Sequence, residues 1–85
     1  MNLQQQFETA VTNSKTLAEK PSNEILLKLY SLYKQATSGD NESEAPSNPF
    51  DFVAKAKHDA WEQLKGTTKE NASQLYIDLI NQLKG

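Results

Sequence analysis

Apolar residues recur at spacings of three and four along most of the chain, which is the period of an amphipathic α-helix. Four stretches show this period: residues 3–18, a second after Ser22, a third from Pro49 to about Lys65, and a fourth behind residues 67–70. The strict alternation of a half-buried strand is not found. The pattern therefore predicts an all-α protein.

Clear signals separate the first two predicted helices. Proline disfavours helix in the residue before it, so Pro21 is expected to end the first helix near Ala18. Ser22 is an expected N-cap, and Glu24 lies in the first turn, where the helix dipole favours an anion. Gly39 is expected to end the second helix.

Residues 39–48 are polar, acidic and without helical period, which predicts a loop longer than the usual helix connection. Asn48 is an expected N-cap with Pro49 at the first helical position, and Gly66 ends this third helix. Residues 67–70 match a capping box for the fourth. We predict a four-helix bundle, because each helix must bury its stripe, and the long loop allows the third helix to start at the other end.

The second helix carries more apolar surface than one core stripe requires. Its core stripe consists of Ile25, Leu29, Leu32 and Ala36. A second group, which adds two phenols and one ammonium, consists of Leu26, Leu27, Tyr30, Tyr33 and Lys34. A small monomer has little reason to show such a face to water unless something covers it. We therefore expect this face to bind a ligand or a partner.

One lysine of the third helix falls inside the apolar stripe. Lys57 lies between Leu64 and Trp61 on the helical projection. Its ammonium either extends along the apolar surface to water or meets an anion whose other parts cover that surface. Tyr30 and Tyr33 favour the second interpretation, because aromatic faces suit a stacked base while lysines suit phosphates.

Composition limits the classes of function. The 85 residues are enough for one domain, and the nine basic residues, all lysine, stand against eleven acidic ones for a net charge of −2. This balance argues against nucleic-acid binding. Without cysteine there is no disulfide, thiolate nucleophile or cysteine-bound zinc. No signal peptide or apolar run near 20 residues occurs, so we expect a soluble cytoplasmic monomer.

Catalysis is not expected. His58 is the single histidine and falls toward the polar side of its helix, so we expect it at the surface rather than acting as a general base. No phosphate loop, nucleophile elbow or metal-spaced cluster occurs, and the carboxylates of residues 40–51 lack the pattern of a calcium loop. The sequence predicts no catalytic residue, no metal site and no cofactor.

Three stretches resemble the acyl-CoA-binding protein family, and the resemblance extends over essentially the whole chain. They are Tyr30–Asp40 (YSLYKQATSGD), Lys55–Gly66 (KAKHDAWEQLKG) and Tyr76-Ile77. The resemblance implies a single acyl-CoA-binding domain over residues 1–85, with up-down-down-up topology. It also implies a non-catalytic carrier and pool former for medium- and long-chain fatty acyl-CoA esters.

The resemblance also assigns site residues. Those implied to contact the CoA head group are Lys15, Tyr30, Tyr33, Lys34, Lys57 and Tyr76. Within this set, Tyr30 is implied to stack near the adenine, and Lys34 and Lys57 to approach the ribose 3′-phosphate. Leu26 and Leu27 match positions that line the acyl path.

Three positions depart from the family's pattern. His58 replaces a usual tryptophan, Val53 stands where a lysine often adds charge, and the stretch at residues 47–50 is one residue longer. The alternative function is a helical protein-interaction module that presents the face from Leu26 to Tyr33 to a partner helix. A membrane-surface helix is disfavoured, because the fourth helix has no lysine-rich polar side.

Overall fold

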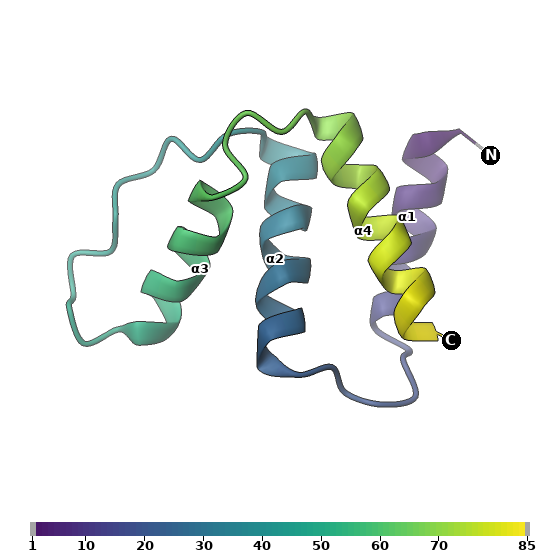
Figure 1. Ribbon diagram of the computed structural model, residues 1–85, viewed down its shortest axis with the longest axis horizontal. Helices are drawn as coiled ribbons and strands as arrows, with labels where there is room; N and C mark the ends of the chain where they lie inside the picture. Colours follow the sequence, from purple (N-terminus) through teal and green to yellow (C-terminus); the bar gives the residue numbers. More distant parts are fainter. Residues whose placement is uncertain (1, 85) are drawn as a thin grey trace.

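The computed structural model describes residues 2–84, and these form four α-helices without a strand. The helices are α1 (Leu3–Ser14), α2 (Asn23–Ser38), α3 (Phe52–Glu62) and α4 (Lys69–Lys84). In Figure 1, α1 and α4 run downward while α2 and α3 run upward, which is an up-down-down-up order. The predicted all-α bundle is therefore confirmed.

The long connection between α2 and α3 makes these two helices parallel. Residues 39–51 leave the top of α2, pass along the outer side of α3 and enter α3 at the bottom (Figure 1). The amino-terminal ends of α2 and α3 therefore lie at the same end of the molecule.

Both predicted ends of α2 are confirmed. The Ser22 hydroxyl accepts a hydrogen bond from the Ile25 N–H at 3.3 Å, as an N-cap should. Gly39 follows the last helical residue with φ 82° and ψ −150°, a backbone conformation that is essentially restricted to glycine.

The predicted end of α1 is wrong by four residues, because the helix stops at Ser14 rather than near Ala18. The last turn is rich in hydroxyl groups that compete for backbone carbonyls. Ser14 Oγ donates to the Val11 carbonyl at 2.6 Å, and Thr16 Oγ1 donates to the Asn13 carbonyl at 3.2 Å. Proline at position 21 is therefore not what ends α1.

The predicted starts of α3 and α4 are also displaced. Asn48 forms a turn in which its side-chain oxygen accepts from the Phe50 N–H at 3.0 Å. The N-cap of α3 is instead Asp51, and the helix begins at Phe52. For α4, the Asn71 N–H donates to the Thr68 hydroxyl at 3.0 Å, so the capping hydroxyl lies one residue later than predicted.

The predicted end of α3 near Lys65 is wrong too, since the helix ends at Glu62 and a turn continues to Gly66. That turn is part of a hydrogen-bonded cluster around the fully buried amide of Gln35. Gln35 Nε2 donates to the Asp40 carboxylate at 2.9 Å and to the Thr67 carbonyl at 2.7 Å, while the Gly66 N–H donates to Asp40 at 2.8 Å. These bonds join the end of α2 to the α3–α4 connection, and both bonds to Asp40 hold the pKa of its carboxyl below the ordinary value of 3.8.

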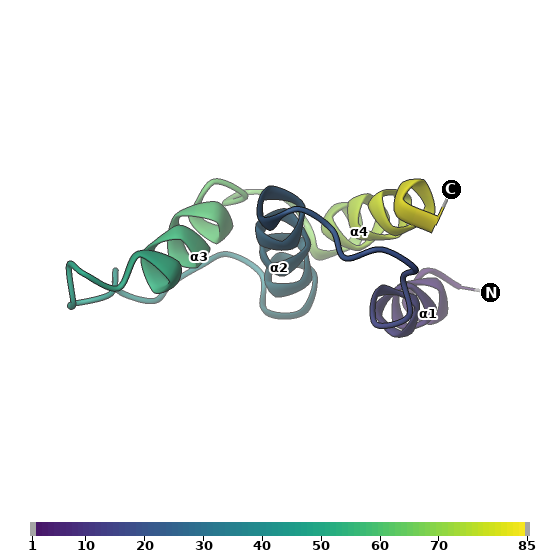
Figure 2. The ribbon, with the colours of Figure 1, turned by 90° about the horizontal axis from the view of Figure 1, so that it is seen from below.

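The core lies among α1, α2 and α4, whereas α2 is the only one of the other described helices on which α3 packs. Figure 2 shows α3 at one edge of a flat molecule of 40 × 28 × 15 Å. The core cluster consists of Phe7, Ala10, Leu29, Leu32, Tyr76, Ile77, Leu79 and Ile80. The predicted stripe of α2 is confirmed, because Leu29 and Leu32 are buried and Ile25 and Ala36 pack at their edge.

One core assignment on α4 is wrong. The helical period of the sequence predicts an apolar stripe that consists of Ala72, Leu75, Tyr76, Leu79, Ile80 and Leu83. Leu75 is 48% exposed, and Ile77 is buried instead. The reason is that α4 packs against α1 on one side and α2 on the other, so its buried arc is rotated from the one that the periodicity predicts.

Candidate functional site

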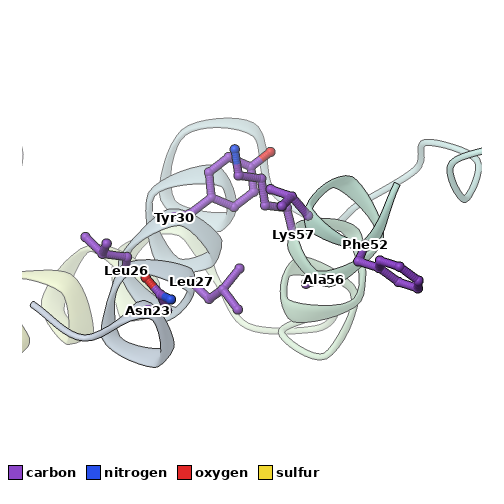
Figure 3. Close-up of a pocket in the computed structure, with 8 residues that line it drawn as sticks. Asn23, Leu26, Leu27, Tyr30, Phe52, Ala56 and Lys57 are labelled. Atoms are coloured by element: carbon purple, nitrogen blue, oxygen red, sulfur yellow. The ribbon is translucent and has the colours of Figure 1, made fainter. Parts of the chain in front are cut away.

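A cleft of about 380 Å³ lies between α2 and α3, where the second apolar face of α2 meets the apolar stripe of α3. Its lining residues are Asn23, Leu26, Leu27 and Tyr30 on α2, with Phe52, Val53, Ala56 and Lys57 on α3. Figure 3 shows Leu27 directed toward α3, and Tyr30 beside Lys57 at one end of the cleft. The walls are largely aliphatic, and the only charged group among the lining residues is the Lys57 ammonium.

A second hollow of about 290 Å³ lies on the other side of α2. Its lining residues are Ser14, Pro21, Leu26, Leu29, Tyr30, Tyr33 and Tyr76. Because Leu26 and Tyr30 line both spaces, the two hollows adjoin along α2. Together they form one surface that is aliphatic on the α3 side and aromatic on the α1 and α4 side.

The aromatic part is held in place by a cluster of three rings from three helices. Phe7 stacks on Tyr33 with centroids 6.0 Å apart and meets Tyr76 edge-on at 5.2 Å. Phe7 and Tyr76 are buried, whereas Tyr33 is 40% exposed. Such arrangements stabilise rings at a fixed orientation, so Tyr33 offers a positioned face to the second hollow.

Two lysines rest on aromatic rings of the opposite helix. Lys57 Nζ of α3 lies 5.2 Å from the centroid of the Tyr30 ring, and Lys34 Nζ of α2 lies 5.0 Å from that of Trp61. The Trp61 indole N–H donates to the Gly39 carbonyl at 2.9 Å, which fixes the ring under Lys34. These cation–π contacts connect α2 to α3 at the upper end of the cleft.

Neither of these ammonium groups has a carboxylate partner within residues 2–84, where the lysine ion pair is Lys65–Glu62. A lysine that rests on a ring keeps its three N–H donors available. Lys34 and Lys57 can therefore bind an anion without first breaking a salt bridge.

The structure brings most of the predicted site residues to these two hollows. Leu26, Leu27, Tyr30 and Lys57 line the cleft, and Tyr33 and Tyr76 line the second hollow.

Two predicted residues line neither hollow. Lys34 is half-buried on Trp61, close to the upper end of the cleft. Lys15 is exposed at the C-cap of α1, directly after Ser14, which lines the second hollow. Both lysines are therefore near the surface formed by the two hollows but outside their walls.

Sequence reasoning missed several lining residues. Val53 and Ala56 share the apolar arc of Lys57, so the helical period of α3 contains the signal that places them at the cleft. Asn23 and Pro21 give no such signal. Pro21 lies in the α1–α2 connection and lines the second hollow, whereas Asn23 is the first residue of α2 and lines the cleft.

The expectation for His58 is wrong, because its side chain is only 15% exposed. Its Nε2 lies 3.3 Å from the Ser43 carbonyl, and the buried Asn41 donates through Nδ2 to the His58 carbonyl at 3.5 Å. The α2–α3 loop folds over the imidazole, which the helical period of α3 alone does not reveal. His58 therefore holds the loop against α3.

Residues 2–84 contain no group of three or more metal-ligating side chains that could hold an ion. Among the same residues, no helix is long and apolar enough to cross a membrane.

Comparison with known proteins gives consistent matches. A family model described as acyl CoA binding protein matches residues 4–80. Acyl-CoA-binding protein homolog 1 of Caenorhabditis elegans is 46% identical over 77 residues, which cover 91% of this chain and 88% of the relative. Enoyl-CoA delta isomerase 2 of Rattus norvegicus is 50% identical over 80 residues, but the chain spans only 20% of that protein.

A solved structure gives the same result for the fold. The crystal structure of Oryza sativa acyl-CoA-binding protein 2 superimposes with a TM-score of 0.90 at 41% sequence identity. The match covers 96% of this chain and 90% of the rice chain.

Proposed function

This chain belongs to the acyl-CoA-binding protein family, and from that premise we propose that it binds medium- and long-chain fatty acyl-CoA esters and carries them as a 1:1 complex. An acyl-CoA joins a long alkyl chain to a polyanionic nucleotide. A protein that binds it needs an apolar groove next to aromatic faces and free cations.

The observation that carries this proposal is the position of Lys57. Its ammonium lies over Tyr30 at the end of a largely apolar cleft, where it has no carboxylate partner among residues 2–84. Tyr30 also lines the aromatic hollow on the other side of α2. The alkyl chain is therefore assigned to the α2–α3 cleft and the head group to the surface around Tyr30 and Tyr33.

We assign roles to the individual residues on this basis. Tyr30 stacks near the adenine, Lys34 and Lys57 bind the ribose 3′-phosphate, and Lys15 contacts a further phosphate. Tyr33 and Tyr76 complete the aromatic wall. The available donors of the two site lysines support this assignment.

The alkyl chain and the phosphates of the ligand contribute differently to the binding free energy. Burying a methylene is worth about 0.8 kcal/mol, so ten buried methylenes supply about 8 kcal/mol before ordering costs. A hydrogen bond to a charged group adds about 1.5 to 3 kcal/mol. The acyl chain of the ligand therefore supplies most of the affinity, and its phosphates supply recognition.

The proposal includes a single domain over residues 1–85 that acts as a monomeric cytoplasmic carrier. It includes no catalysis by this segment, because the relatives that match over most of their length are named for binding, whereas the isomerase match covers a small part of that enzyme.

Isothermal titration calorimetry tests the function directly. Palmitoyl-CoA is expected to bind one to one, and much more tightly than acetyl-CoA or free palmitate, because each of the latter lacks one half of the ligand. Equal affinities for acetyl-CoA and palmitoyl-CoA would contradict the proposal. Capture of a helical peptide without any acyl-CoA binding would instead support the protein-interaction module.

The role of Lys57 is tested by comparing CoA esters with dephospho-CoA esters. Lys57→Ala is expected to weaken the binding of palmitoyl-CoA by roughly tenfold to hundredfold, the value of one charged hydrogen bond, and the binding of palmitoyl-dephospho-CoA far less. Lys55→Ala is the matched control, because Lys55 is exposed on the same helix and lines neither hollow. Equal weakening of both esters means that Lys57 does not bind the 3′-phosphate.

A further inference from the structure

Three large apolar side chains are exposed where the α2–α3 loop enters α3. Phe50 is 80% exposed, Phe52 is 72% exposed and Val53 is 66% exposed. Phe52 and Val53 also line the cleft, whereas Phe50, two residues before Phe52 in the chain, does not. A small protein seldom exposes two phenylalanine side chains to this extent unless they form part of an interaction site.

These residues lie at the end of the cleft away from its cation. Lys57 and Tyr30 mark the upper end, and Asn23 and Phe52 mark the lower end, where α2 and α3 both begin (Figures 1 and 3). With the head group held at the upper end, the acyl chain points toward the lower end, and its terminal methyl leaves the cleft beside Phe52.

The length of the cleft limits how much of the acyl chain it covers. Asn23 and Tyr30 are seven positions apart on α2, which corresponds to about 10.5 Å at 1.5 Å per residue. An extended chain advances about 1.2 Å per bond, so the cleft holds roughly nine bonds. An octanoyl chain fits within it, whereas about half of a palmitoyl chain extends beyond.

We propose that Phe50 and Phe52 cover the part of a long acyl chain that extends beyond the cleft, and that they set the preference for long over medium chains. This inference rests on the proposed function. Both rings start from a fixed backbone, because Asp51 caps α3 by accepting from the Ala54 N–H at 3.0 Å and Asn48 accepts from the Phe50 N–H at 3.0 Å.

The Phe52 ring points away from α2 in Figure 3, and its high exposure leaves it free to change rotamer. Rotamer changes of exposed side chains take picoseconds to nanoseconds, so the ring turns over a bound chain without any movement of the helix. Contacts between the end of the acyl chain and the two phenylalanine rings therefore form only when the acyl chain is long enough to reach the rings.

The test measures dissociation constants for octanoyl-CoA and palmitoyl-CoA in the wild type, in Phe50→Ala and in the double variant Phe50→Ala/Phe52→Ala. The ratio of palmitoyl to octanoyl affinity is expected to fall severalfold in the single variant and at least about tenfold in the double variant, since each buried methylene is worth about fourfold in affinity. Leu75→Ala is the matched control, because Leu75 is 48% exposed but lies on α4 outside both hollows. It should leave the ratio unchanged.

An unchanged affinity ratio in the double variant would overturn the inference, and so would an equal loss at both chain lengths. Flotation with phosphatidylcholine vesicles adds a second arm: loss of vesicle association at an unchanged ratio would assign the rings to a membrane contact and overturn the inference. Failure of the wild type to bind octanoyl-CoA would instead contradict the proposed function, so the two failures are distinguishable.

Discussion

Lys34 and Lys57 face aromatic rings rather than carboxylates, although the chain has eleven acidic residues. A ring attracts an ammonium without neutralising it, whereas a carboxylate would compete with a phosphate. The two lysines are therefore positioned before an anion arrives and remain able to bind it. The same rings also hold α2 and α3 at the separation that forms the cleft.

The ring under Lys34 is open to a direct test. Trp61→Leu removes both the cation–π contact and the indole hydrogen bond to the Gly39 carbonyl, whereas Trp61→Phe removes the hydrogen bond and keeps a ring. The contact is worth about 0.5 to 1 kcal/mol, so CoA without an acyl chain is expected to bind roughly twofold to fivefold more weakly to the leucine variant than to the phenylalanine variant. Calorimetry measures this difference, and equal affinities would show that the ring does not position Lys34.

Asp40 makes the free energy of unfolding depend on pH. Hydrogen bonds from the Gly66 N–H and from Gln35 lower the pKa of its carboxyl in the folded state, so the folded state favours the ionised form. This stabilisation is complete above the unfolded pKa near 3.8 and is lost as the pH falls through the lower folded pKa. Wild type is therefore expected to be more stable than Asp40→Asn at neutral pH.

The difference in unfolding free energy between the two proteins should shrink as the pH falls below 3.8. Urea titrations between neutral and acidic pH measure it. Glu44→Gln serves as the control, because Glu44 is exposed in the α2–α3 loop outside the Gln35 cluster. A difference that stays constant with pH would contradict the assignment.

Among the helices, α3 is the least supported. It carries no fully buried side chain, and α2 is the only one of the other described helices on which it packs. The Gln35 cluster and the Trp61 indole hold its carboxyl end, while its amino end borders the open cleft. A ligand that fills the cleft would touch both walls and tie α3 to α2.

Hydrogen exchange tests this at the scale of the helix. Amides of α3 are expected to exchange faster than those of α2 and α4, since few buried contacts oppose local opening. Palmitoyl-CoA should slow exchange in α3 more than in α1, which supplies only the far side of the second hollow. Mass spectrometry of peptic fragments measures both effects. The strongest protection appearing in α1 would contradict the assignment of the chain to the α2–α3 cleft.

At the scale of the whole molecule, α4 is the central element of the core because it packs against both α1 and α2. Ile80 is fully buried there, among residues of the core cluster. This core supports α2, on which both hollows depend, without contributing most of their walls. Stability and binding therefore depend on largely separate residues.

The substitution Ile80→Ala should lower stability while leaving ligand binding intact. Removing a buried isoleucine side chain costs about 2 to 5 kcal/mol of unfolding free energy. Saturating palmitoyl-CoA is expected to restore part of this loss, about 2.7 kcal/mol at a hundredfold excess over the dissociation constant. Thermal melts with and without ligand measure both effects, with Asn81→Ala as an exposed control on the same helix. A folded Ile80→Ala protein that gains no stability from ligand would mean that the core does affect the binding surface.

The four helices, their order and most of their apolar faces could be predicted from the sequence, because periodicity and capping are local properties of the chain. The sequence located the ends of α2 correctly, since Ser22 and Gly39 act within one turn of their own positions. The sequence also placed Tyr30 on a second apolar face of α2 and Lys57 inside the apolar stripe of α3. Both positions indicate contact with a ligand or a partner.

The division of the apolar surfaces between the core and the two hollows depends on how the helices pack together. Leu75 is exposed and Ile77 is buried because α4 packs against two helices at once. His58 is covered by a loop that the helical period does not predict. The contact of Lys57 with Tyr30 joins residues far apart in the chain, and it exists because the long loop makes α2 and α3 parallel. Such contacts depend on the relative placement of whole helices, which local sequence signals do not specify.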